Sequence, residues 1–251
     1  MDFGIAAMLF SAGVAGGVVN AIAGGATLIT FPAMLAAGLP AVVANASNAV
    51  AVTPGHLFAA LADRKRLPVL DRSFAIAVVA AAAGGVVGAL LLLTTPERLF
   101  VLLVPALIAL ATLMFAFGRR VQAALSHFAS DNGARTRYAL MLPVTAYGGY
   151  FGAGLGVMLL AVLTMTGRED VRTANALKNV LATATSLATI AIFIAQGVIR
   201  WPETLVMLAG AVGGGLLGGK LIAVLPAALV RALVIALGVG MTAIYAWRYW
   251  L

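Results

Sequence analysis

The sequence contains no cysteine and only two histidines, and only 10% of its residues are charged. Without cysteine there can be no disulfide, thiol redox centre or cysteine-ligated metal. The phosphate loop GxxxxGK[ST], the zinc motif HExxH, the calcium loop DxDxDG and the nucleophile elbow GxSxG are absent as well. We therefore expect no enzyme, no cofactor and no ATP-driven transport by this chain alone.

The rest of the composition is strongly apolar. Hydrophobic residues make up 63% of the chain and the mean hydropathy is +1.08, far above the values of soluble domains. This composition predicts an all-α polytopic membrane protein that contacts the lipid bilayer. The N-terminus, MDFGIAAMLF, has no basic stretch before its apolar run, so we interpret it as a retained segment rather than a cleaved signal peptide.

The formal net charge of +8 does not indicate nucleic-acid binding. The basic residues lie in short stretches between apolar runs and form no stripe or arm. That placement is typical of the cytoplasmic loops of a membrane protein. No nucleic-acid partner is predicted.

The chain contains a degenerate internal repeat with an offset of 130 residues, held without a gap across more than seventy positions. The matched positions include Gly24 and Gly154, Asn45 and Asn175, Gly84 and Gly214, Gly88 and Gly218, and Pro96 and Pro226. A constant offset over this length indicates a doubled unit. We therefore divide the chain into a first membrane repeat at 1–118, a cytoplasmic linker loop at 119–137 and a second membrane repeat at 138–251.

Each repeat divides into five apolar segments. They cover about 3–22, 26–37, 41–62, 73–93 and 97–117 in the first repeat, and about 138–153, 155–166, 172–196, 203–223 and 227–249 in the second. The last three of each repeat have the length of a span, which needs roughly 20 residues. The second of each is too short, and with the first it is expected to form a broken or re-entrant pair, buried in protein or lining a cavity.

The odd number of segments per repeat predicts two inverted-topology repeats. Lys and Arg then give the orientation. Eleven of them fall in loops on the side of the linker, and three fall on the opposite side. Both termini are therefore predicted to be extracytoplasmic. Glycine-rich faces in segments 73–93 and 203–223 would let helices pack closely, within the chain or in a homo-oligomer.

Ionisable residues inside apolar segments are rare here and therefore informative. Lys178 lies about six residues into its segment, and no carboxylate occurs in a segment centre to pair with it. Its ammonium either extends to the cytoplasmic interface or binds an anion beside Asn175 and Asn179. His56 lies mid-segment next to Pro54. It either hydrogen-bonds to backbone freed by the proline or relays protons.

Small polar residues gather near the starts of two long segments, in register between the repeats. They are Asn45, Ser47 and Asn48 in the first repeat, and Asn175 and Asn179 in the second. Helix N-termini in a membrane present free N–H groups to an anion, so these side chains are candidate oxyanion ligands. Interhelical hydrogen bonding for stability alone is the alternative. Glycines at the turns of the short pairs would let backbone N–H groups approach the ligand; they are Gly24, Gly25, Gly152 and Gly154.

The two glycine-to-asparagine stretches resemble the paired signature of the sulfite exporter TauE/SafE family. The matching pieces are Ala23-Gly24-Gly25, Thr30-Phe31-Pro32, Gly38-Leu39-Pro40 and Ala44–Asn48, then Phe151–Gly154, Asn175–Asn179 and Trp201-Pro202. The second repeat departs from the first by placing Arg168-Glu169-Asp170 where the first has Gly38-Leu39-Pro40. The resemblance covers essentially the whole chain. It implies an inner-membrane permease for small sulfur-containing anions such as sulfite and sulfonates.

The function predicted from these features is export of a small sulfur-containing anion by alternating access between the two repeats. Lys178 would supply the charge, and the asparagines with Ser47 would supply hydrogen bonds. Two alternatives stay open. One is a permease or channel for another small solute, and the other is a non-catalytic subunit of a membrane complex.

Overall fold

The computed structural model describes residues 1–22, 25–126, 133–166, 170–221 and 226–251. Within these ranges the chain forms ten α-helices and one short 3-10 helix. They are α1 (Phe3–Ile22), α2 (Thr27–Ala36), α3 (Ala41–Ala62), η1 (Arg64–Arg66), α4 (Arg72–Thr94), α5 (Glu97–Ser126), α6 (Gly133–Tyr150), α7 (Leu155–Thr166), α8 (Val171–Ala195), α9 (Trp201–Leu221) and α10 (Ala227–Trp250). The ten apolar segments expected from the sequence are therefore all helical.

The polar stretch expected as a linker loop is mostly helix. α5 continues to Ser126 and α6 already begins at Gly133, so helices extend into 119–137 from both sides. The residues that prolong α5, RRVQAALS, contain neither glycine nor proline and are mainly good helix formers. Polarity therefore predicted the end of the apolar span but not the end of the helix.

In the part of the chain that the structure describes, five helices are long and apolar enough to cross a membrane: α1, α4, α5, α8 and α10. α1 was expected to be part of a broken pair, yet it has the length and composition of a span by itself. α3 and α9 were also expected to span, and with 22 and 21 residues they are long enough. Their described residues, however, have a lower mean hydropathy than the five helices just named. In α3 the reason is its polar residues, most of which are buried against other helices.

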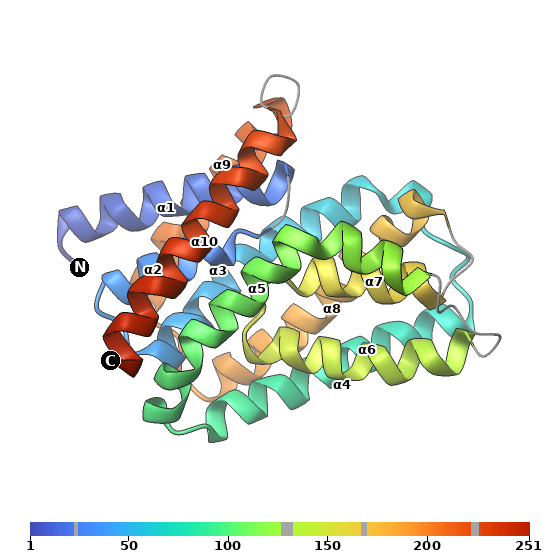
Figure 1. The fold of residues 1–251 in the computed structure, drawn as a ribbon, viewed down its shortest axis with the longest axis horizontal. Coiled ribbons are helices and arrows are strands. Elements are labelled where there is room, and N and C mark those ends of the chain that lie inside the picture. Colours follow the sequence, from blue (N-terminus) through green and yellow to red (C-terminus); the bar gives the residue numbers. More distant parts are fainter. Residues whose placement is uncertain (23–24, 127–132, 167–169, 222–225) are drawn as a thin grey trace.

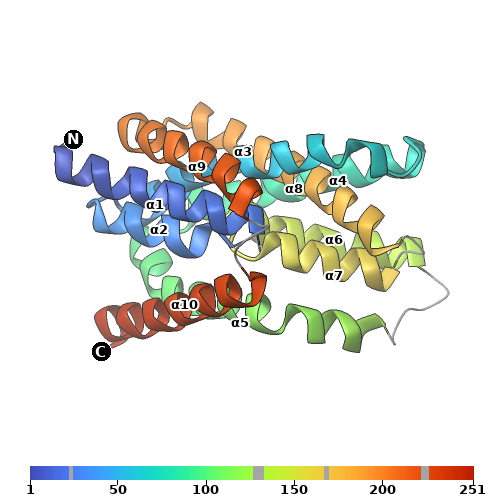
Figure 2. The same cartoon turned by 90° about the horizontal axis from the view of Figure 1, so that it is seen from above.

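Two helical hairpins enter the bundle from opposite ends. α1 runs from the end that holds both termini to the middle of the molecule, and α2 returns to that end (Figure 1). α6 and α7 form the corresponding hairpin from the other end, where α5 finishes and α8 begins (Figures 1 and 2). The two turns meet in the middle, and Phe31 of α2 contacts Phe151 edge-to-face with ring centroids 5.3 Å apart. The short segments expected from the sequence are thus hairpin arms.

The closest helix pairs of the bundle each join one helix from the first half of the chain to one from the second half. α1 packs closely on α9 and α4 packs closely on α6, so the first helix of each half lies on the fourth helix of the other. Glycines allow the approach, because a Cβ at Gly214 would collide with the Val14 backbone and one at Gly88 with the Ala146 backbone. The predicted packing role is confirmed for Gly88 and Gly214, whereas Gly213 and Gly215, which belong to the same glycine-rich segment, face open space.

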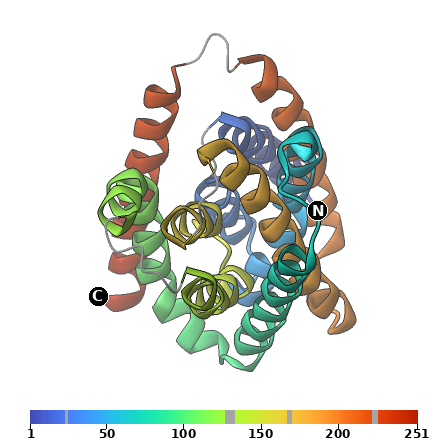
Figure 3. The same cartoon turned by 90° about the vertical axis from the view of Figure 1, so that its right-hand side faces the viewer.

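α5 and α10 form one wall of the bundle, while α3 and α8 cross its interior next to α2 and α7, as the view along the long axis shows (Figure 3). The start of α5 also fixes α3. The Glu97 carboxylate accepts hydrogen bonds from the backbone N–H groups of Ala41 and Val42, the first two residues of α3. This contact satisfies donors that a helix N-terminus otherwise leaves unpaired.

Candidate functional site

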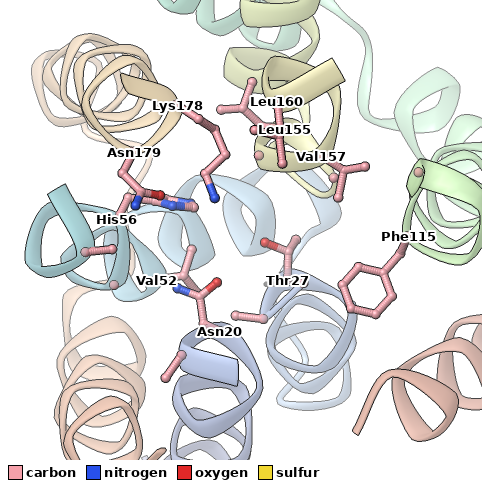
Figure 4. A pocket seen from close by; sticks show the side chains of 18 of the residues that line it. Asn20, Thr27, Val52, His56, Phe115, Leu155, Val157, Leu160, Lys178 and Asn179 are labelled. Carbon is pink, nitrogen blue, oxygen red and sulfur yellow. The ribbon is translucent and has the colours of Figure 1, made fainter. Parts of the chain in front are cut away.

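A cavity of about 910 Å³ lies where the two hairpin turns meet α3 and α8. Figure 4 shows polar side chains pointing into it from different helices, among them Lys178 and Asn179 on α8, His56 on α3 and Asn20 on α1. α5 and α10 complete its lining. We call this space the central cavity. Its lining comes from both halves of the chain.

Glycines at the hairpin turns bring backbone to the cavity wall. Gly25, Gly152 and Gly154 line the cavity and have φ values of 95°, 80° and 83°. Residues with a Cβ rarely adopt this left-handed conformation, so glycine is required for the turns. Gly24, which the sequence placed in the same turn, lies outside the described residues.

The N-terminal ends of two short helices face the same space. Thr27 begins α2 and Leu155 begins α7, and both residues line the central cavity. The first turn of a helix carries the positive end of the helix dipole. Several N–H groups of these two turns are already paired, such as Leu28 with the Gly25 carbonyl and Val157 with the Gly154 carbonyl, so the dipole is their main contribution. Two such ends, from hairpins that enter from opposite sides, make the cavity favourable for a negative charge.

Lys178 directs its ammonium into the cavity (Figure 4). The ammonium donates a hydrogen bond of 2.8 Å to Oδ1 of Asn175, whose Nδ2 in turn lies 3.4 Å from Oδ2 of Asp63. Asp63 also forms an ion pair of 3.2 Å with Arg66 at the exposed end of α3. The sequence showed no carboxylate within a segment centre. In the structure the Asp63 carboxylate, just past the end of α3, is linked to the Lys178 ammonium through the Asn175 side chain.

Among the described residues that line the cavity, those with charged side chains carry both signs, and positive charge is in excess. Lys178 and Arg231 are cationic and Asp63 is anionic. The Arg231 guanidinium donates a hydrogen bond of 2.9 Å to the carbonyl of Ala116, which holds it between α10 and α5. This balance favours a solute with negative charge over a cation.

Asn20, Asp63 and Arg231 are among the polar lining residues that were not singled out from the sequence. Asn20 is the only amide in segment 3–22, and that isolation was a usable signal. Asp63 and Arg231 lie at helix ends, where charged residues are common, so the pattern gave no reason to select them. His56 and Asn179 line the cavity next to Lys178, and Asn179 is buried.

The polar cluster at the start of α3 lies outside the central cavity. The Asn45 amide donates a hydrogen bond of 2.9 Å to the carbonyl of Tyr150, the last residue of α6. Ser47 accepts one of 3.1 Å from the backbone N–H of Arg200, just before α9. Asn48 is buried at 2% exposure, and the part of the chain that the structure describes offers its Oδ1 no hydrogen-bond partner. The repeat offset matched Asn45 to Asn175, but only Asn175 lines the cavity.

Asp170 determines where α8 begins. Its side chain accepts hydrogen bonds from the backbone N–H groups of Arg172 and Thr173, at 2.8 Å and 3.0 Å. These bonds, led by that of Thr173, hold the pKa of the Asp170 carboxyl below its ordinary value. The cap places Lys178 about two turns inside α8. Arg168 and Glu169, which precede it, lie outside the described residues.

The model of the family described as Sulfite exporter TauE/SafE matches residues 9–245. The chain belongs to this family. A "Probable membrane transporter protein" from Haemophilus influenzae is 32% identical over 222 residues, which cover 85% of this chain and 84% of that protein. No solved structure matches the chain. As a TauE/SafE family member the chain is a membrane transporter for a small solute and not an enzyme.

Proposed function

We propose that this TauE/SafE family member exports a small sulfur-containing anion, sulfite or an organosulfonate, across the inner membrane. The observation that carries the proposal is the Lys178 ammonium in a cavity reached by both hairpin turns. A sulfonate or sulfite oxygen would accept a charge-assisted hydrogen bond from this group. Asn175 and Asn179 would donate further bonds from α8, and the backbone at Gly25, Gly152 and Gly154 would approach the anion closely.

The arrangement of the halves supports alternating access. In many secondary transporters the substrate binds near the bilayer midplane, at the interface of inverted repeats with broken helices. Here two hairpins enter from opposite ends, and the halves exchange equivalent contacts, α1 with α9 and α4 with α6. We infer that these are inverted repeats and that both termini are extracytoplasmic, because Arg64, Lys65 and Arg66 gather at the end away from the termini.

His56 is the proposed proton relay. It lies on α3 beside Val52 and Ala59, on the face that lines the cavity, and its ring points toward the space around Lys178 (Figure 4). Burial and the nearby Lys178 ammonium disfavour a charged imidazole at this position, and an anion bound beside Lys178 would offset that repulsion and favour protonation of His56. Proton exchange at this position would change the charge next to the bound anion and couple its movement to a proton.

Uptake into proteoliposomes tests the substrate class directly. Purified protein is reconstituted and offered labelled sulfite, sulfoacetate, taurine, sulfate and a neutral sugar under identical conditions. We expect saturable movement of sulfite or a sulfonate and none of the sugar. Movement of the neutral solute alone would leave the family assignment in place and contradict the anion mechanism.

A further inference from the structure

A second, smaller cavity lies beside the central one, toward the outer side of the bundle. It has a volume of about 260 Å³ and lies between α1, α3 and α9. Its walls are largely aliphatic or glycine backbone, with Ala211, Val212 and Gly215 from α9. Phe58 and Leu216 line it as well and are 52% and 69% exposed, so they mark its outer side. We call this space the lateral pocket.

The lateral pocket adjoins the central cavity. Six residues line both spaces: Asn20, Ala21, Ala26, Val52, Gly55 and Ala59. At the boundary Gly55 has no side chain, and the Asn20 amide occupies the place that a Cβ at Gly55 would take. A side chain of α1 and bare backbone of α3 therefore form part of the boundary between a charged space and an apolar one.

The size and chemistry of the lateral pocket fit a short hydrocarbon chain. An apolar cavity of about 150 Å³ stays dry and binds benzene, so 260 Å³ accommodates several carbons. A free hydrocarbon would gain nothing from Lys178 in the neighbouring cavity. An ion without a tail would leave the lateral pocket empty. A molecule with an anionic head and an apolar tail uses both.

We propose that the substrate is an organosulfonate with an apolar tail of several carbons. Its head lies near Lys178 in the central cavity and its tail lies in the lateral pocket. The proposal rests on the anion transport proposed above and narrows the substrate class. Each methylene group that leaves water for the pocket should tighten binding by about fourfold, until the pocket is full.

The test compares linear sulfonates of increasing length. Binding of ethanesulfonate, butanesulfonate and hexanesulfonate to the purified protein in nanodiscs is measured by calorimetry. Gly215→Leu fills the lateral pocket, since a Cβ at Gly215 meets nothing within 4 Å. Gly213→Leu is the matched control: it is on the same helix, its Cβ also meets nothing within 4 Å, and it does not line the pocket.

We expect affinity to rise with chain length in the wild type and in Gly213→Leu. In Gly215→Leu the rise should be lost while ethanesulfonate binds as before. An equal rise in all three proteins would overturn the proposal, because the tail would then lie in the bilayer. A phospholipid that co-purifies with the wild type and is lost from Gly215→Leu would assign the pocket to lipid and overturn it too.

The outcomes separate this proposal from the proposed function. If ethanesulfonate binds and Lys178→Ala abolishes its binding, but chain length has no effect, the anion site stands and the tail site fails. If no sulfonate of any length binds, or if Lys178→Ala binds all of them as tightly as the wild type, both proposals fail.

Discussion

Asn45 and Tyr150 are 105 positions apart in the chain, and the side-chain amide of Asn45 donates a hydrogen bond of 2.9 Å to the Tyr150 carbonyl. The carbonyls in the last turn of a helix have no intrahelical partner, and Tyr150 ends α6. The bond therefore satisfies a helix C-terminus inside the bundle and ties the second hairpin to α3. Asn175, its counterpart in the repeat, instead holds the Lys178 ammonium.

This difference predicts opposite phenotypes for two asparagine substitutions. Asn45→Ala leaves the Tyr150 carbonyl unpaired and should cost about 1–3 kcal/mol of stability. Asn175→Ala removes a partner of Lys178 and a proposed donor to the anion, so it should weaken the apparent affinity for the anion with little loss of stability. Thermal unfolding in detergent and the concentration dependence of uptake separate the two effects. Equal unfolding midpoints for Asn45→Ala and the wild type would contradict the assigned role.

The contact between α1 and α9 predicts a contrast between neighbouring glycines. A Cβ at Gly214 would collide with the Val14 backbone, so Gly214→Ala should destabilise the fold by about 1–3 kcal/mol. Gly213→Ala adds a Cβ into open space and should be neutral or stabilising by up to about 1 kcal/mol, because alanine favours a helix over glycine. Thermal unfolding of the two purified variants measures the contrast. Similar unfolding midpoints would show that the helices do not approach as described.

The cap at the start of α8 predicts a pH-dependent contribution to stability. The folded pKa of Asp170 is lowered by hydrogen bonds to its charged form, so the contribution is complete above the unfolded pKa, near 4. It is lost as the pH falls through the folded pKa. Asp170→Ala should therefore unfold at a lower temperature than the wild type at pH 7, and the gap should close toward pH 3.

Asp170→Asn is the control for this effect. Asparagine also caps helices well but does not titrate, so the variant should unfold near the wild-type temperature at pH 7. The difference in unfolding temperature between Asp170→Asn and Asp170→Ala should stay the same as the pH is lowered. If the unfolding temperatures of the wild type and Asp170→Ala differed by the same amount at pH 7 and at pH 3, the stabilising effect of the cap would not depend on the charge of Asp170.

The order and limits of the helices could be predicted from the sequence because apolar runs and their breaks are local signals. Segments 41–62 and 155–166 coincide with α3 and α7 to the residue. The extension of α5 to Ser126 was missed, since a polar helix carries no apolar run. Segments 41–62 and 203–223 were expected to span because of their length, and that stays a prediction: the described residues of α3 and α9 are long enough but less apolar than those of the five candidate spans.

The cavity lining could be predicted only in part. Lys178, Asn175 and Asn179 were identified because polar residues are rare in apolar segments, and all three line the cavity. The same rarity selected Ser47 and Asn48, which lie elsewhere. Composition cannot tell a polar residue that meets another helix from one that faces a cavity. That distinction depends on contacts between segments more than a hundred residues apart.

The central claim is that Lys178 carries the charge that binds the anion. Uptake of labelled sulfite and sulfoacetate is measured in proteoliposomes containing the wild type, Lys178→Ala or Lys65→Ala, a lysine exposed on η1. Hydrogen bonds to charged groups contribute about 1.5–3 kcal/mol, so Lys178→Ala should weaken the apparent affinity about ten- to hundredfold. Lys65→Ala should leave it unchanged. Equal affinities in the two variants would contradict the claim.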